Sequence, residues 1–118
     1  MLKNNELLAP VGSPAAFYAA ISSGCNAIYL GLDKFSARAY ATNFNLDNLK
    51  EYVDYAHLRN VKVFVTMNTV LYDRELNDAY DTVDQLAKIG VDAIIVQDLA
   101  LVNYIVNHYK SLEAHAST

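Results

Sequence analysis

Three side chains able to orient or activate a substrate come directly after apolar segments of the chain. Asn68 follows the longest of these segments, and Gln97 and Asp98 end a later one. A side-chain amide can hold a substrate carbonyl or hydroxyl, although it can equally tie down its own loop. Asp98 is better suited to cap the next helix. We therefore take Asn68 as a candidate catalytic residue and Gln97 as a candidate substrate-binding residue.

Two ionisable residues near the ends of the chain complete the candidate catalytic group. His115 lies in residues 112–118, which have the pattern of a short strand. An imidazole at the rim of a site can act as acid, base or metal ligand, although a lone histidine is more often structural. Glu6 opens the first apolar segment and either stays solvated or points into the interior. In the second case it is the stronger catalytic candidate.

The longest irregular stretch, residues 32–45, is the first place to expect ligand contacts. Connections between a strand and a helix usually take about 2 to 6 residues, and longer ones often bind ligands. Arg38 can clamp a carboxylate or phosphate through two parallel hydrogen bonds, with Tyr40 and Asn43 beside it. In the alternative reading, the flanking phenylalanines fix the loop to the domain while its cations, including Lys34, face water.

These residues are positioned by apolar segments that alternate with helical patterns. Residues 61–70 are mostly apolar on both faces, and residues 6–10, 27–31 and 93–98 repeat that design. Strands of this kind are typical of parallel sheets covered by helices. The predicted helix N-caps are Ser13, Asn45, Asp73 and Asp98, and the predicted helix ends are Gly24, Asn60 and Gly90.

The order of elements predicts an α/β fold of parallel (βα) repeats. Residues 24–30 and 90–96 match in type at nearly every position, as expected of repeated units. The chain has no glycine-rich dinucleotide fingerprint and no P-loop. Polar residues instead gather at the C-terminal ends of the strands, and this placement favours the first half of a TIM-type (β/α)8 barrel over a doubly wound sheet. Gly12, which follows the first strand, is a further substrate-binding candidate. We predict one domain, residues 1–118, ending at the start of the fifth strand.

Composition narrows the class of protein. The chain has 118 residues, 53% of them hydrophobic and 19% charged, and a net charge of -4, which argues against a general nucleic-acid coating role. A single cysteine, Cys25, offers neither a disulfide framework nor a metal cluster. No signal peptide or membrane span is visible, so we predict a cytoplasmic protein. The two open sheet edges of a half barrel predict a homo-oligomer if the chain is isolated.

Other ionisable and aromatic side chains are assigned to structure. His57 and His108 fall on predicted helices and are expected at the surface. The tyrosines are expected to pack on helix faces with a wet hydroxyl. These include Tyr52, Tyr55, Tyr72 and Tyr104.

Six blocks of the sequence resemble a known family in order and spacing. They are residues 6–13, 27–31, 35–44, 63–69, 96–98 and 115–118. Together they resemble the N-terminal part of the collagenase-like proteases of unassigned catalytic type (peptidase family U, the thirty-second unassigned family). The resemblance implies a barrel domain at the start of a longer protein. It also implies that relatives are either proteases or oxygen-independent hydroxylation proteins, the latter with an iron–sulfur cluster held by cysteines beyond this segment.

Three functions follow as alternatives. The first is a hydrolase of the collagenase-like family, although no nucleophile elbow, H-E-x-x-H motif or paired cysteine and histidine is present. The second is a barrel segment of a hydroxylation protein acting on RNA or a quinone precursor. The third is a noncatalytic fragment that only folds or assembles. A small-molecule, peptide or RNA substrate is left open, no cofactor is expected within this chain, and the chain alone is expected to be inactive on gelatin.

Overall fold

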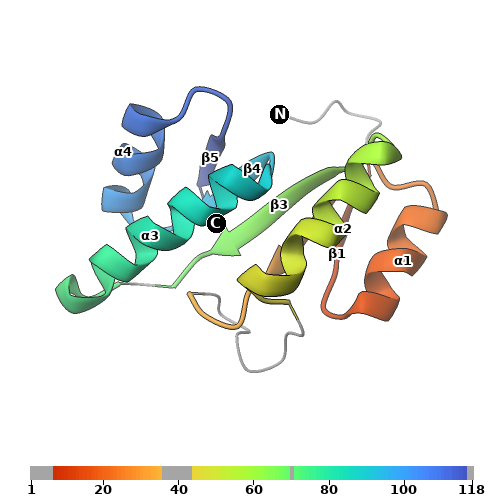
Figure 1. Ribbon diagram of the computed structural model, residues 1–118, viewed down its shortest axis with the longest axis horizontal. Helices are drawn as coiled ribbons and strands as arrows, with labels where there is room; N and C mark the ends of the chain where they lie inside the picture. The colour runs from red at the N-terminus through yellow and green to blue at the C-terminus, as the bar shows by residue number, and fades with distance from the viewer. Residues whose placement is uncertain (1–6, 36–43, 70, 117–118) are drawn as a thin grey trace.

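The computed structural model describes residues 7–35, 44–69 and 71–116 (Figure 1). Within these ranges every strand is parallel to its neighbours, and the strands follow one another across the sheet in chain order. The predicted α/β fold of parallel strand and helix repeats is therefore confirmed. The strands are β1 (Leu8–Pro10), β2 (Ala27–Gly31), β3 (Lys62–Met67), β4 (Ala93–Val96) and β5 (Glu113–Ala116).

The helices connecting these strands are α1 (Pro14–Ser22), α2 (Leu46–Leu58), α3 (Asp73–Ile89) and α4 (Leu99–His108). Three predicted N-caps are confirmed because each side chain accepts a backbone N–H of the first turn: Ser13, Asn45 and Asp98.

The predicted cap of α3 is wrong by one residue. Asp73 is already helical, and Tyr72 is the N-cap. The Tyr72 backbone N–H donates to Glu75 Oε1 at 3.0 Å, and the Glu75 N–H donates to the Tyr72 carbonyl at 2.8 Å. This reciprocal pair starts the helix one residue earlier, because the carboxylate of Glu75 binds the Tyr72 N–H and so fixes Tyr72 as the residue before the first turn.

Glycine is required where α3 ends. Gly90 has φ +100° and its N–H donates to the Leu86 carbonyl, as a left-handed helix end should. Asn60 adopts φ +60° after α2. The predicted ends at Asn60 and Gly90 are confirmed. Gly24, with φ +91°, directly follows Ser23, the C-cap of α1.

We expect Gly90→Ala to lower the free energy of unfolding by about 1 to 2 kcal/mol, because a side chain is strained at this φ. Gly12→Ala is a matched control. A Cβ at either position would meet no atom within 4 Å, and Gly12 does not have a positive φ in this range. Urea unfolding followed by circular dichroism should separate the two variants, and equal stabilities would contradict this account.

The main core lies between the helices and one face of the sheet, and Figure 1 shows β3 running between α2 and α3. Strand residues Val63, Val65 and Ile94 pack there against Val53 of α2 and Leu86 of α3. Alternate strand residues point to the other face, which we call helix-free because no residue of the described helices belongs to its cluster. Ala27, Phe64 and Ala93 form a second buried cluster on that face, flanked by Tyr29 and Ile95.

Two side chains on the helix-free face meet across an intervening strand. The rings of Phe64 on β3 and His115 on β5 lie 5.2 Å apart at 87°, although β4 separates their strands. The backbones of alternate strands in a flat sheet are about 9.6 Å apart, at about 4.8 Å per step, so the two side chains lean toward each other over β4. Ala93, which pairs with Phe64 in register, is small enough to leave room for this contact. We infer that the helix-free face is concave.

Candidate functional site

The C-terminal ends of the strands lie along one edge of the sheet, because all strands are parallel. Gly12 comes just after β1, Asn68 follows β3, and Gln97 follows β4. Gly12 and Gln97 are exposed, whereas Asn68 is half-buried. The structure thus places these three predicted site residues along the same edge, and their roles stay predictions.

His115 lies inside the concave face and not at its rim. It pairs in register with Ile95 of β4, one residue before the end of β5. Its side chain is 17% exposed, and its Nε2 lies 2.7 Å from Glu113 Oε1. This hydrogen bond holds the pKa of the Glu113 carboxyl below its usual value. A carboxylate that orients an imidazole against an aromatic ring is an arrangement able to move a proton.

The remaining predicted site residues lie outside the described residues: Glu6, Arg38, Tyr40 and Asn43. The ends of the long connection are described. Phe44 is fully buried and Phe35 packs against the main core, as expected if the phenylalanines fix the loop. Lys34 forms an ion pair with Asp78 of α3 at 3.1 Å, so it does not simply face water.

Tyr72 is a surface residue, and the prediction that it packs on a helix face is wrong. Tyr52, Tyr55 and Tyr104 pack against the core as predicted, but Tyr72 is 66% exposed. It precedes α3 at the same edge of the sheet as Asn68. The glutamate three residues later was the available signal, because a capping box places its first residue outside the helix.

Comparison with known proteins places the chain in a family. The sequence profile of peptidase family U32 matches residues 12–118. The chain belongs to peptidase family U32. The family resemblance found in the sequence is therefore confirmed.

Relatives of this U32 chain carry two kinds of name. The chain is 41% identical to the 23S rRNA 5-hydroxycytidine C2501 synthase of Escherichia coli, over 96% of this chain and 17% of the relative. It is 33% identical to a collagenase of Porphyromonas gingivalis, over 96% of this chain and 27% of the relative. It is 32% identical to the tRNA hydroxylation protein P of Helicobacter pylori (strain 26695), over 96% of this chain and 27% of the relative. The chain thus spans well under a third of these relatives.

A solved structure shares the fold. The U32 peptidase Mk0906 superposes with a TM-score of 0.73 at 18% identity, over 99% of this chain and 51% of that one. At this identity the likeness concerns the fold alone. It agrees with the parallel five-stranded sheet and its alternating helices.

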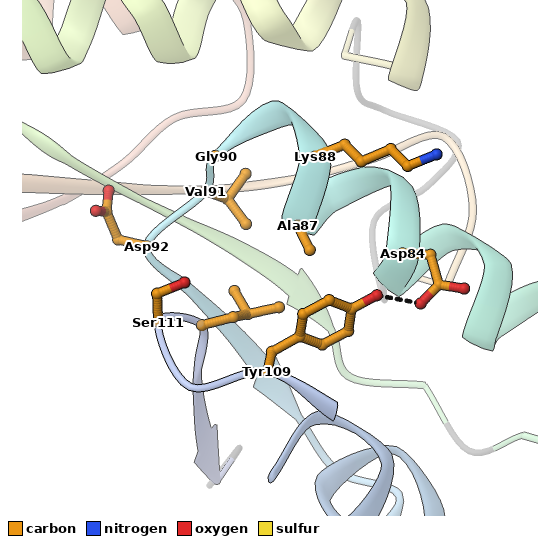
Figure 2. A pocket seen from close by; sticks show the side chains of 9 residues that line it. Asp84, Ala87, Lys88, Gly90, Val91, Asp92, Tyr109 and Ser111 are labelled. Atoms are coloured by element: carbon orange, nitrogen blue, oxygen red, sulfur yellow. Dashed lines mark hydrogen bonds between the residues drawn. The ribbon is translucent and has the colours of Figure 1, made fainter. Parts of the chain in front are cut away.

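The U32 chain has a pocket of about 430 Å³ at the opposite end of the strands (Figure 2). Val91 and Asp92 line it just before β4, and Ser111 lines it before β5. Figure 2 shows Tyr109 on one wall with its hydroxyl directed at the Asp84 carboxylate. Because it lies at the N-terminal ends of the strands, this pocket is separate from the candidate site.

The Asp84 carboxylate accepts hydrogen bonds from two phenols. The Tyr104 hydroxyl donates to it at 2.9 Å, and the Tyr109 hydroxyl donates to it as well. These bonds lower the pKa of Asp84, Tyr109 having the larger effect, and the Asp84 bond raises the pKa of Tyr109 to about 12. The two predicted surface histidines are exposed, as expected, but each has a partner: His57 contacts Asp92 at 2.8 Å and His108 stacks on Tyr104.

We expect Tyr109 to ionise near pH 12 in the folded protein, whereas a free tyrosine ionises near 10. Because the folded pKa is raised, this hydrogen bond contributes stability below about pH 10, and that contribution is lost as the pH rises toward 12. Tyrosinate absorbance during alkaline titration, with Tyr109→Phe subtracted, measures the pKa. Asp84→Asn should return it toward 10, whereas Asp81→Asn, on the exposed side of α3, should not. Ionisation of Tyr109 near 10 in the unchanged protein would contradict the hydrogen bond.

Residues able to bind a metal do not cluster in the described ranges. These ranges contain no group of three or more His, Cys, Asp or Glu residues able to hold a metal ion. Cys25 is buried in the main core, and this burial raises the pKa of its thiol. An iron–sulfur cluster is held by several cysteine thiolates, so the side chains of residues 7–35, 44–69 and 71–116 do not fit one. None of the helices in these ranges is long and apolar enough to cross a membrane.

Proposed function

We propose that this chain is the opening segment of a (β/α)8 barrel in an RNA-hydroxylating protein. The observation that carries this proposal is the 41% identity to an rRNA 5-hydroxycytidine synthase over nearly the whole chain. The tRNA hydroxylation protein supports the same class of substrate. In this proposal the concave face and the adjoining strand ends hold the nucleobase that is modified.

The geometry of the site suits a nucleobase. Asn68 and Gln97 follow neighbouring strands, and side-chain amides match the donor and acceptor pattern of a base edge. Tyr29 is half-buried on the concave face, pairs in register with the buried Phe64, and supplies an aromatic contact. His115, oriented by Glu113, is the group placed to carry a proton to or from the base.

The barrel itself is part of the proposal. The curvature implied by the Phe64 and His115 contact is of the kind that closing a sheet requires. At the sheet's margins, β1 and β5 each pair with one strand among the described elements. In the full-length protein, later strands would pair with these edges, and an isolated chain would pair with a second copy. An iron–sulfur cluster would take its cysteine ligands from outside the described residues.

Peptide hydrolysis is the second candidate function. It is favoured by the collagenase that is 33% identical to this chain. The His115 and Glu113 pair would then activate a water molecule instead of exchanging a proton with a nucleobase. The noncatalytic alternative remains for the chain when it is expressed alone.

The test is to express the full-length protein in Escherichia coli that lacks its 23S rRNA 5-hydroxycytidine C2501 synthase. Mass spectrometry of digested 23S rRNA and of total tRNA should detect a hydroxylated nucleoside that is missing from the parent strain. A parallel assay of the purified protein on gelatin should be negative. Gelatin cleavage without any new nucleoside would instead establish the second function. Fractionation should recover the protein in the cytoplasm, where these RNAs lie.

A further inference from the structure

The ring of Tyr72 is presented to solvent beside the candidate site. It is 66% exposed, one of the more exposed large aromatic or aliphatic side chains described. Its position between β3 and α3 puts it four residues after Asn68. A single exposed ring is common on protein surfaces, so its place beside the strand ends and its neighbours carry the argument.

The backbone that carries this ring is held firmly. The Tyr72 N–H is bound by Glu75 Oε1 at 3.0 Å, and the Tyr72 carbonyl is bound by the Glu75 N–H at 2.8 Å. The preceding residue, Leu71, packs against the main core. A ring on a fixed backbone loses little freedom when it binds, because only its side-chain torsions remain to be ordered.

Cations accompany the aromatic rings along this edge. The Arg74 guanidinium lies 5.6 Å from the centre of the Tyr72 ring. On the neighbouring connection after β2, the Lys34 ammonium lies 5.5 Å from the centre of the Phe35 ring. The Lys34 ion pair with Asp78 at 3.1 Å ties that connection to α3, so the two aromatic and cation pairs belong to adjoining strand ends.

We propose that Tyr72, with Arg74 beside it, is a stacking platform for an unpaired base of the RNA substrate that flanks the base held in the site. This inference rests on the proposed function and names a residue that positions its substrate. Sequence-specific proteins bind RNA mainly where bases are unpaired and can stack on aromatic or guanidinium planes.

Local charge favours a base over a phosphate at this platform. Asp73 and Glu75 lie in the first turn of α3, beside Tyr72, and Asp78 follows one turn later. These carboxylates repel the RNA backbone and offset the attraction of Arg74 and Lys34. Stacking on the neutral face of the Tyr72 ring is less sensitive to that repulsion. We therefore expect the contribution of Tyr72 to RNA affinity to change little with salt concentration.

The experiment measures binding of the full-length protein to a fluorescent single-stranded oligonucleotide that spans the modified position, by anisotropy. Tyr72→Ala should weaken binding about 10-fold, within the range found when one stacked base loses its aromatic partner. Tyr72→Phe should bind within about twofold of the unchanged protein, because the ring remains. Tyr18→Ala is the matched control, since Tyr18 is 45% exposed but lies on α1, away from the strand-end edge. A fully paired duplex of the same sequence should bind the unchanged protein and Tyr72→Ala alike.

Each result decides between the proposals. Loss of single-strand affinity in Tyr72→Ala, with recovery in Tyr72→Phe, supports the platform. If the unchanged protein modifies RNA but Tyr72→Ala binds as tightly, the platform is wrong and the proposed function stands. An equal loss on single strand and duplex would also overturn it, because stacking needs an unpaired base. If the unchanged protein neither binds nor modifies RNA, both proposals fail.

Discussion

Changing His115 to alanine in the full-length protein is expected to lower the yield of hydroxylated nucleoside at least about 100-fold. A positioned proton carrier contributes about 100-fold to 10,000-fold to a reaction rate. His115 is 17% exposed, contacts Phe64 and is oriented by Glu113 at 2.7 Å. It is therefore the described ionisable group best placed on the concave face to serve this role. The measurement is a time course of RNA modification with purified protein.

The controls separate chemistry from folding. His108→Ala changes an exposed histidine on α4 that stacks on Tyr104, away from the concave face, and should keep full activity. Glu113→Gln should reduce activity less than His115→Ala, because the amide oxygen at position 113 can still accept a hydrogen bond that orients the imidazole. Full activity in a folded His115→Ala protein would show that this histidine is structural and that the proton carrier lies elsewhere.

The second large effect is on stability. Phe17→Ala should lower the free energy of unfolding by about 3 to 5 kcal/mol, the usual cost of emptying an aromatic core position. Phe17 of α1 is fully buried, and its ring centre lies 4.9 Å from Tyr52 and 5.8 Å from Tyr55 of α2. Because domains are stable by only about 5 to 15 kcal/mol, this change removes a large fraction of the total.

Urea unfolding followed by circular dichroism measures that loss. Tyr18→Ala on the same helix is the matched control, because Tyr18 is 45% exposed and a smaller loss is expected. Equal effects of the two changes would mean that α1 is not anchored through Phe17.

Much of the fold could be predicted because its signals are local. Residues 61–70 are mostly apolar on both faces, as is typical of a strand inside a parallel sheet, and residues 62–67 of this stretch form β3. The caps Ser13, Asn45 and Asp98 could also be predicted, since each depends on side chains within three residues. Tyr72 was misjudged because a tyrosine next to a helix pattern can lie inside or outside it, and the carboxylate of Glu75 decides which.

The candidate site was predictable only in outline. Strand direction alone brings Gly12, Asn68 and Gln97 to one edge, and the sequence pattern predicts strand direction. The contact between His115 and Phe64 depends on how the sheet bends, which no local pattern encodes. The hydrogen bonds of Asp84 likewise join residues 20 and 25 positions apart in the chain. Such pairings follow from tertiary packing and had no signal in the sequence.

Ala93 influences the geometry of the candidate site, although its own side chain carries no functional group. It is fully buried on the concave face and pairs with Phe64 on one side and Glu113 on the other. Its single methyl group acts as a spacer, since a bulkier side chain there would push the imidazole of His115 off the phenylalanine ring. Reactivity in this protein would thus be tunable from a position without any functional group.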